Sequence, residues 1–191
     1  MQEVLLSVEN STDTVLYALD ETYIRTESNN YKSWSLKGHA PIIERNGSHK
    51  GLNIVGATEI IKQFDSLTDC YSYDVSLDSS KIIKFLENLI DKNKGKMVKV
   101  ILDNAGNHKS KAIKKFKSAH SNDLQLIYLP PYSPELNPQE NIWNKIKKCL
   151  FRLRSRVSLD ELFCNLSAFL ERLNLNTEEV KSIVYAKNYY K

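Results

Sequence analysis

The sequence has no long hydrophobic segment and no secretion signal. No apolar run approaches the roughly 18 to 20 residues needed to cross a bilayer, and the first residues, MQEVLLSVENSTD, carry acids where a signal peptide carries lysines. These absences argue against a membrane-bound or exported protein. We expect a soluble, cytoplasmic protein with no membrane partner.

Cysteine and histidine are scarce as well. The three cysteines, at positions 70, 149 and 164, and the four histidines form no CxxC, HxxxH or CxxH pattern. This spacing argues against structural zinc and against a disulfide framework. We expect the cysteines to be small buried side chains in a reducing compartment.

The remaining composition is that of an ordinary globular protein. Of 191 residues, 41% are hydrophobic and 26% are charged, and 27 Lys and Arg against 23 Asp and Glu give a formal net charge of +4. This length and usage fit one folded domain with its own core and exclude a disordered chain.

Strand patterns dominate the first half of the chain. Residues 14–19 (TVLYAL) are a short apolar run that ends at Asp20, and residues 22–26 could pair with it as a hairpin. Further strands are expected at 52–58 and near 70–75. Together these segments predict an antiparallel meander.

Helices and strands then alternate. Apolar residues recur at three- and four-residue steps through 82–90, which predicts an amphipathic helix, and a second helix is expected at 112–119. Strands at 97–102 and 124–129 flank the second helix. This alternation predicts parallel pairing of the two strands.

A proline-rich loop precedes the last helices. Four of the five prolines fall within residues 130–138, and a helix at 159–173 begins a tail that fits either core or interface. We expect Trp143 to pack in the core, whereas Trp34 lies in a polar stretch and could stack on a base. One long helix is predicted between loop and tail from an apolar stripe: Ile142, Trp143, Ile146, Cys149, Leu150 and Leu153.

Three acids stand at the ends of predicted core elements. Asp20 follows the first strand, Asp103 follows the strand at 97–102, and Glu140 lies in the first turn of the helix after the proline loop. Clustered carboxylates repel each other unless divalent cations neutralise them, and oxygen ligands favour Mg²⁺ or Mn²⁺. Two such ions about 4 Å apart can activate a nucleophile and stabilise the leaving oxygen of a phosphodiester. The acids therefore predict nuclease or strand-transfer chemistry.

Structural explanations for the same acids remain open. Asp20 could be a turn residue, and DNAGNH, which begins at Asp103, is a good β-turn sequence. For the third acid, Asn137, Pro138 and Glu140 fit a capping box that would serve any helix.

A cationic segment follows Glu140. Such a run is usually a solvated face, but beside a carboxylate cluster we favour binding of DNA phosphates. Six basic residues and no acid occupy twelve positions: Lys145, Lys147, Lys148, Arg152, Arg154 and Arg156.

Two segments resemble a known family. LDNAGNHKSK (102–111) and YLPPYSPELNPQENIWNKIKK (128–148) closely resemble the second and third signature blocks of DDE transposases of the Tc/mariner superfamily, in particular the bacterial insertion-sequence branch called IS-six-thirty. YALDETYI followed by WSLKGHAP resembles the first block. The resemblance extends from about residue 14 to about residue 150.

The resemblance implies an α/β, RNase H-like fold, with a mixed five-stranded sheet and helices on both faces. Residues 1–191 would form a single catalytic domain, with a core at about 14–150 and a C-terminal helical extension at 151–191.

The same resemblance implies a catalytic triad of Asp20, Asp103 and Glu140 that binds two Mg²⁺ or Mn²⁺ ions. Asn104 and His108 could orient the second aspartate or touch DNA. The implied enzyme cleaves DNA at transposon ends and transfers the freed strand into target DNA, commonly at a TA dinucleotide, as a homodimer.

Members of this family carry a helix-turn-helix DNA-binding module before the catalytic domain, and no such module precedes Asp20 in this sequence. We therefore expect the catalytic half alone, either as a reading frame that works with a separately encoded N-terminal DNA-binding half or as a truncated element. The alternative is a catalytically inactive remnant or a non-specific DNA-binding module. A ribonuclease H acting on hybrids is a third candidate, against which the proline block and the helix-borne glutamate argue.

Overall fold

The computed structural model describes residues 2–27, 36–39, 48–131, 133–150 and 158–189. Within these ranges one mixed sheet has the strand order β3-β2-β1-β4-β5. Strand β2 runs antiparallel to β1 and β3, whereas β4 runs parallel to β1 and β5. The predicted parallel pairing of the strands at 97–102 and 124–129 is confirmed. The predicted meander is confirmed for β1, β2 and β3, but not for a separate strand at residues 22–26. The strands are β1 (Thr14–Arg25), β2 (Gly51–Glu59), β3 (Ser66–Ser72), β4 (Met97–Leu102) and β5 (Leu124–Tyr128).

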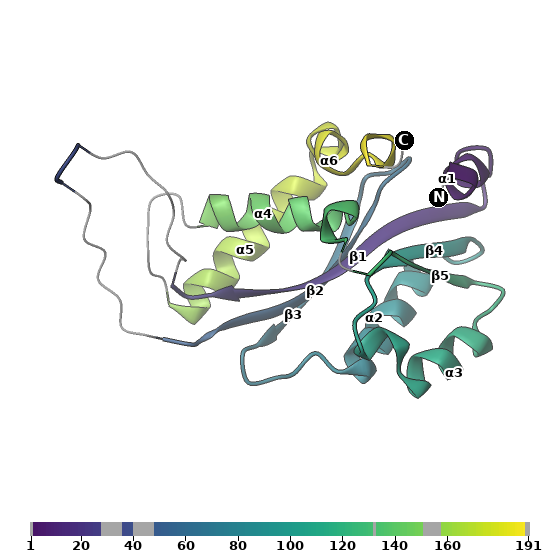
Figure 1. The fold of residues 1–191 in the computed structure, drawn as a ribbon, viewed down its shortest axis with the longest axis horizontal. Coiled ribbons are helices and arrows are strands. Elements are labelled where there is room, and N and C mark those ends of the chain that lie inside the picture. Colours follow the sequence, from purple (N-terminus) through teal and green to yellow (C-terminus); the bar gives the residue numbers. More distant parts are fainter. Residues whose placement is uncertain (1, 28–35, 40–47, 132, 151–157, 190–191) are drawn as a thin grey trace.

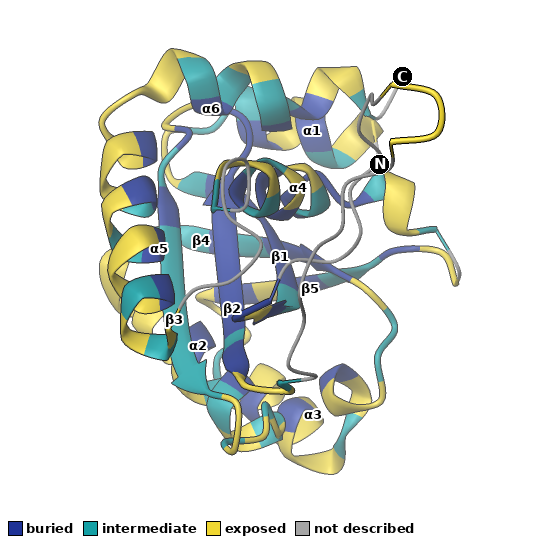
Figure 2. Ribbon diagram, turned by 90° about the vertical axis from the view of Figure 1, so that its left-hand side faces the viewer, coloured by how far each residue is buried: buried dark blue, intermediate teal, exposed yellow. Residues whose placement is uncertain are grey.

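Helices cover both faces of this sheet (Figure 1). Helices α2 (Ser79–Lys92) and α3 (Lys111–Ala119) pack on one face. The other face is covered by α1 (Gln2–Glu9), α4 (Gln139–Leu150), α5 (Leu159–Asn174) and α6 (Thr177–Val184). Figure 2 shows the buried strands between helices whose outer faces are exposed. None of the helices in the described ranges combines the length and apolarity that crossing a membrane requires.

The alternation of side chains along β1 divides the core into two parts. Val15, Tyr17 and Leu19 belong to the cluster beneath α2 and α3. Leu16 and Ala18 belong to the cluster beneath α4, α5 and α6. Successive strand residues point to opposite faces of the sheet. The same alternation therefore decides toward which face Asp20 and Glu21 point.

Strand β1 corrects the prediction of a hairpin at its end. The chain does not turn after Asp20, because β1 continues to Arg25 and pairs with β2 from Tyr17↔Glu59 to Arg25↔Gly51. Asp20 and Glu21 are the polar residues that suggested the end of the strand. They lie beyond the last residue of β1 that pairs with β4, which is Ala18, opposite Ile101.

The tail of the chain is core. Val180, Val184 and Ala186 are fully buried in the cluster beneath α4, which decides between the two possibilities left open for this segment. The cysteine prediction is wrong, because Cys149 and Cys164 are exposed and Cys70 is half-buried. The buried part of the α4 stripe ends at Ile146.

Candidate active site

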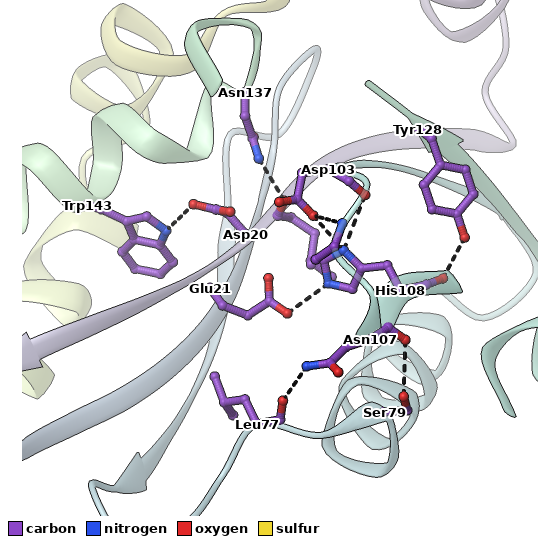
Figure 3. Close-up of polar contacts among 12 residues, drawn as sticks. Asp20, Glu21, Leu77, Ser79, Asp103, Asn107, His108, Tyr128, Asn137 and Trp143 are labelled. Atoms are coloured by element: carbon purple, nitrogen blue, oxygen red, sulfur yellow. Dashed lines mark hydrogen bonds and ion pairs between the residues drawn. The ribbon is translucent and has the colours of Figure 1, made fainter. Parts of the chain in front are cut away.

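Asp20 occupies the middle of β1. Its even register with Leu16 and Ala18 directs the carboxylate toward α4, where the indole Nε1 of Trp143 donates a hydrogen bond to Asp20 Oδ2 (3.0 Å; Figure 3). The side chain is buried, with 9% of the residue exposed. Trp143 is fully buried, as predicted, and it therefore contributes both core volume and a hydrogen-bond donor to the acid.

A glycine makes room for this indole. Strand pairing places Gly56 opposite Asp20, and a Cβ atom at residue 56 would lie 2.5 Å from Trp143 Cη2. That distance is too short for any side chain. Sequence reasoning missed this role, although a lone glycine inside a strand is a known sign of close approach.

Asp103 directly follows β4, and its carboxylate has two partners. Its Oδ1 accepts a hydrogen bond from the Ala105 N–H (2.9 Å) and lies 2.8 Å from His108 Nδ1. The interpretation of this segment as a turn is correct, because an aspartate that accepts a hydrogen bond from the N–H two residues later stabilises a turn. The turn also brings a histidine onto the acid.

His108 links Asp103 to Glu21. The imidazole is fully buried, and its Nε2 lies 2.8 Å from Glu21 Oε1. Burial lowers the pKa of His108, but the hydrogen bond and charge of Glu21 and the charge of Asp103 outweigh burial and raise the pKa to about 8. The protonated imidazole therefore donates to both carboxylates at neutral pH.

Three hydrogen bonds hold the loop that carries His108 (Figure 3). The Tyr128 hydroxyl donates to the carbonyl of His108 (2.8 Å), and Asn107 Nδ2 donates to the carbonyl of Leu77 (2.8 Å). The Ser79 hydroxyl donates to the carbonyl of Asn107 (3.1 Å). Contacts to β5 and to the start of α2 thus fix the loop and the imidazole in place.

Glu140 lies in the first turn of α4, and Asn137 holds the start of this helix in place. Asn137 Nδ2 donates to the carbonyl of Leu19 (2.9 Å), which ties the start of the helix to the strand residue before Asp20. Asn137 caps the start of α4 as predicted, because its Oδ1 accepts from the N–H of Gln139 (3.2 Å). The capping box is not completed by Glu140, because the Asn137 N–H donates to the carbonyl of Pro134 (2.9 Å).

The three acids share one cavity of about 530 Å³. Burial raises the pKa of Asp20 to about 8, and the charges of Glu140, Glu21 and Asp103 add to the rise. The carboxyl groups of Asp20, Asp103 and Glu140 therefore line one space together, and much of the remaining wall is formed by Asn104, Leu129, Pro130, Pro131, Ser133 and Pro134.

The other predicted residues have different surroundings. Asn104 Nδ2 donates to the carbonyl of Leu129, which anchors the residue after Asp103 to the end of β5. Lys145 forms an ion pair with Glu179 of α6, and Lys148 is exposed. Lys147 is half-buried and has an interaction partner. Four predicted nucleic-acid contacts lie outside the described residues: Trp34, Arg152, Arg154 and Arg156.

A family model for the DDE superfamily endonuclease matches residues 15–163, a range that contains all three acids. This chain belongs to the DDE superfamily of endonucleases. No curated protein matches it in sequence.

Solved structures show the same fold as this DDE superfamily chain. The Mos1 mariner paired end complex with Mn matches with a TM-score of 0.67 and 15% identity over 99% of this chain and 60% of that chain. The Mos1 Strand Transfer Complex matches with a TM-score of 0.64 and 15% identity over 100% of this chain and 59% of that one. This chain thus spans about three fifths of their length.

A solved structure of a catalytic domain alone matches this chain over most of both chains. The Mos1 transposase catalytic domain with Raltegravir and Mg matches with a TM-score of 0.58 and 15% identity, over 99% of this chain and 92% of that one. The predicted fold, a mixed five-stranded sheet of RNase H-like type with helices on both faces, is confirmed.

The donor chemistry of this DDE superfamily site fits a hard divalent cation. Three carboxylates line the cavity, and carboxylate oxygens are the ligands that Mg²⁺ and Mn²⁺ prefer. Within the described ranges, however, no three His, Cys, Asp or Glu side chains stand together as a ready metal cage. Trp143 and His108 each occupy one carboxylate oxygen, so a shared cation requires side chains to turn toward it.

Proposed function

We propose that this chain is the catalytic domain of a DDE transposase of the Tc/mariner superfamily, of the IS-six-thirty branch that its motifs resemble. It would cleave DNA at transposon ends and transfer the strand into target DNA by in-line displacement at phosphorus. The observation that carries the proposal is that three carboxylates from separate elements line one cavity. Mos1 transposase structures that include a strand transfer complex share its fold.

Each catalytic group has a defined role in this proposal. Asp20, Asp103 and Glu140 would hold two Mg²⁺ or Mn²⁺ ions, which when bound supply Lewis-acid activation of the attacking and leaving oxygens. Trp143 fixes one oxygen of Asp20, and His108 fixes one oxygen of Asp103. Such outer contacts commonly set both orientation and affinity at metal sites.

The proposed partners are transposon-end and target DNA, bound by a homodimer. The alternative, an inactive remnant or a non-specific DNA-binding module, needs no competent site. The three intact acids around one cavity favour the active enzyme.

Calorimetric titration with Mn²⁺, followed by nicking of supercoiled DNA, tests the proposal. The wild type should bind Mn²⁺ and nick the plasmid, and Asp103→Asn should lose both. Asp123→Asn is the matched control. Asp123 is exposed and precedes the first residue of β5, whereas Asp103 follows the last residue of the parallel strand β4. Cleavage of an RNA–DNA hybrid in preference to duplex would indicate a ribonuclease H.

Three outcomes decide between the functions. Loss in Asp103→Asn but not in Asp123→Asn supports the transposase. Metal binding without nicking of any DNA indicates a competent site that lacks contacts to its DNA substrate. No Mn²⁺ binding at millimolar concentration by folded wild-type protein contradicts the metal-dependent triad and supports the remnant.

A further inference from the structure

Helix α3 and the turn before it carry an unbalanced positive charge. Between Asp103 and Asp123 the sequence has no acidic residue, and without the five lysines in this interval the net charge of +4 would be −1. All five are exposed, and none forms an ion pair with a described residue. The five are Lys109, Lys111, Lys114, Lys115 and Lys117.

Helical geometry gathers three of these lysines on one side. Ile113 and Phe116 are buried against the sheet, and at about 100° per residue Lys111, Lys114 and Lys115 fall together on the opposite, outer side. The fourth, Lys109, lines the cavity that contains Asp20, Asp103 and Glu140. We call Lys109, Lys111, Lys114 and Lys115 the α3 lysine face.

The fold places this face beside the cavity. Asp103 follows β4, the turn with His108 comes next, and α3 starts at Lys111 and returns toward the start of β5 (Figure 1). Lys109 therefore lines the cavity, and Lys111 follows it two residues later at the start of α3. Lys109 Nζ is also 5.7 Å from the centre of the Tyr128 ring, which gives that lysine a defined position.

These charges oppose the stability of their own helix. The N-terminus of a helix favours acids, yet the first turn of α3 has none and begins with Lys111. Like charges three and four residues apart also repel. Helices α5 and α6 follow the ordinary rule, with two acids each in the first turn. Helix stability thus does not account for the lysines of α3.

We propose that the α3 lysine face binds the phosphate backbone of duplex DNA and holds it across the cavity. The inference rests on the proposed function and adds a surface other than the cationic segment after Glu140. In that segment Lys145 is already paired with Glu179. Uncompensated lysines beside a site for phosphodiester chemistry match a polyanionic strand, and lysine charges without base-reading groups bind it independently of sequence.

The test compares two triple variants by anisotropy of a labelled 30-bp duplex in EDTA, over a range of NaCl concentrations. One variant is Lys111→Gln, Lys114→Gln and Lys115→Gln. The control, Lys94→Gln, Lys96→Gln and Lys99→Gln, removes the same charge at the start of β4, the opposite end of the strand that leads into Asp103. Thermal melting confirms that both variants fold.

The α3 variant should bind the duplex roughly tenfold more weakly at 50 mM salt, and the slope of log affinity against log salt should fall by about 2 to 3. The control should keep the wild-type slope. Equal losses in both variants would show an effect of net charge, and an unchanged α3 variant or a wild type that binds no duplex would also overturn the proposal.

Failure here is separable from failure of the proposed function. Mn²⁺ binding and plasmid nicking by wild type, set against Asp103→Asn, judge the active site alone. If those succeed while the α3 variant binds duplex like the wild type, the transposase assignment stands and DNA lies on another face.

Discussion

Asp20 and Glu21 are neighbours in the sequence, yet their side chains serve opposite faces of the sheet. Asp20 accepts from Trp143 on α4, and Glu21 pairs with His108 beneath the other layer. Strand alternation is the reason. Two adjacent acids can therefore do different work, one inside the cavity and one behind the loop that holds Asp103.

The indole of Trp143 gives a sharp prediction at this scale. Trp143→Phe keeps an aromatic ring in the core but removes the N–H that bonds Asp20 Oδ2. We expect Mn²⁺ affinity and the nicking rate to fall by about tenfold, since loss of such outer contacts commonly weakens metal sites 10- to 100-fold. Calorimetry measures the affinity and plasmid nicking measures the rate.

A core substitution elsewhere provides the comparison for Trp143→Phe. Phe85→Leu perturbs the buried cluster beneath α2, which does not contain Asp20 or Trp143. It should lower the melting temperature and leave Mn²⁺ affinity unchanged. If Trp143→Phe likewise lost only stability, the hydrogen bond would have no part in positioning Asp20.

At the scale of elements, the site depends on how closely α4 approaches β2. The helix starts where Asn137 bonds the carbonyl of Leu19, and the Gln139 side chain accepts from the Thr58 hydroxyl (2.7 Å). These bonds seat the indole of Trp143 directly over Gly56. The spacing between helix and strand is therefore part of the site.

Gly56→Ala tests that spacing. The new Cβ would meet Trp143 Cη2 at 2.5 Å, and such overpacking typically costs about 1 to 3 kcal/mol in the free energy of unfolding. Mn²⁺ affinity should fall as well, because the displaced indole pulls its N–H from Asp20. Denaturant unfolding and calorimetry measure the two effects.

Gly106→Ala is the matched control for this change. Gly106 has a right-handed helical backbone conformation, and a Cβ there meets nothing within 4 Å. It should stay within about 0.5 kcal/mol of wild type, as most surface substitutions do. Equal stability of the Gly56 and Gly106 variants would mean that α4 does not approach β2 as closely as described.

At the scale of the whole molecule, the buried acid links global stability to pH. Burial and neighbouring charges raise the pKa of folded Asp20 from 3.8 to about 8, so between these values the folded state binds a proton that the unfolded state has lost. The associated stability is fully present below about pH 4 and disappears as the pH rises through 8. Asp20→Asn removes this dependence.

Melting curves of the metal-free proteins test the linkage. A rise of about four pKa units corresponds to roughly 6 kcal/mol. At pH 9 the wild type should therefore melt more than about 10 °C below Asp20→Asn, and the difference should shrink toward pH 5. The titration of His108 is present in both proteins, so the comparison isolates Asp20. Saturating Mg²⁺ should stabilise the wild type alone. A difference that did not vary with pH would contradict the raised pKa.

The sequence by itself determined most of the elements and the positions of the acids. Apolar periods predicted α2, α3 and the parallel strands, since local pattern follows burial on one face. Motif spacing pointed to Asp20, Asp103 and Glu140, which the fold gathers around one cavity. Those features depend on short stretches of chain, which sequence records directly.

Only the tertiary structure decided what depends on distant partners. Pairing with β2 carries β1 past Asp20 without a turn, the His108 imidazole meets Glu21 across 87 residues of sequence, and Trp143 lies over Gly56. Contact with α6 likewise neutralises Lys145 and leaves the α3 lysines as unpaired charge among the described residues. No local pattern encodes these pairings, because each is fixed by packing between elements that the sequence keeps far apart.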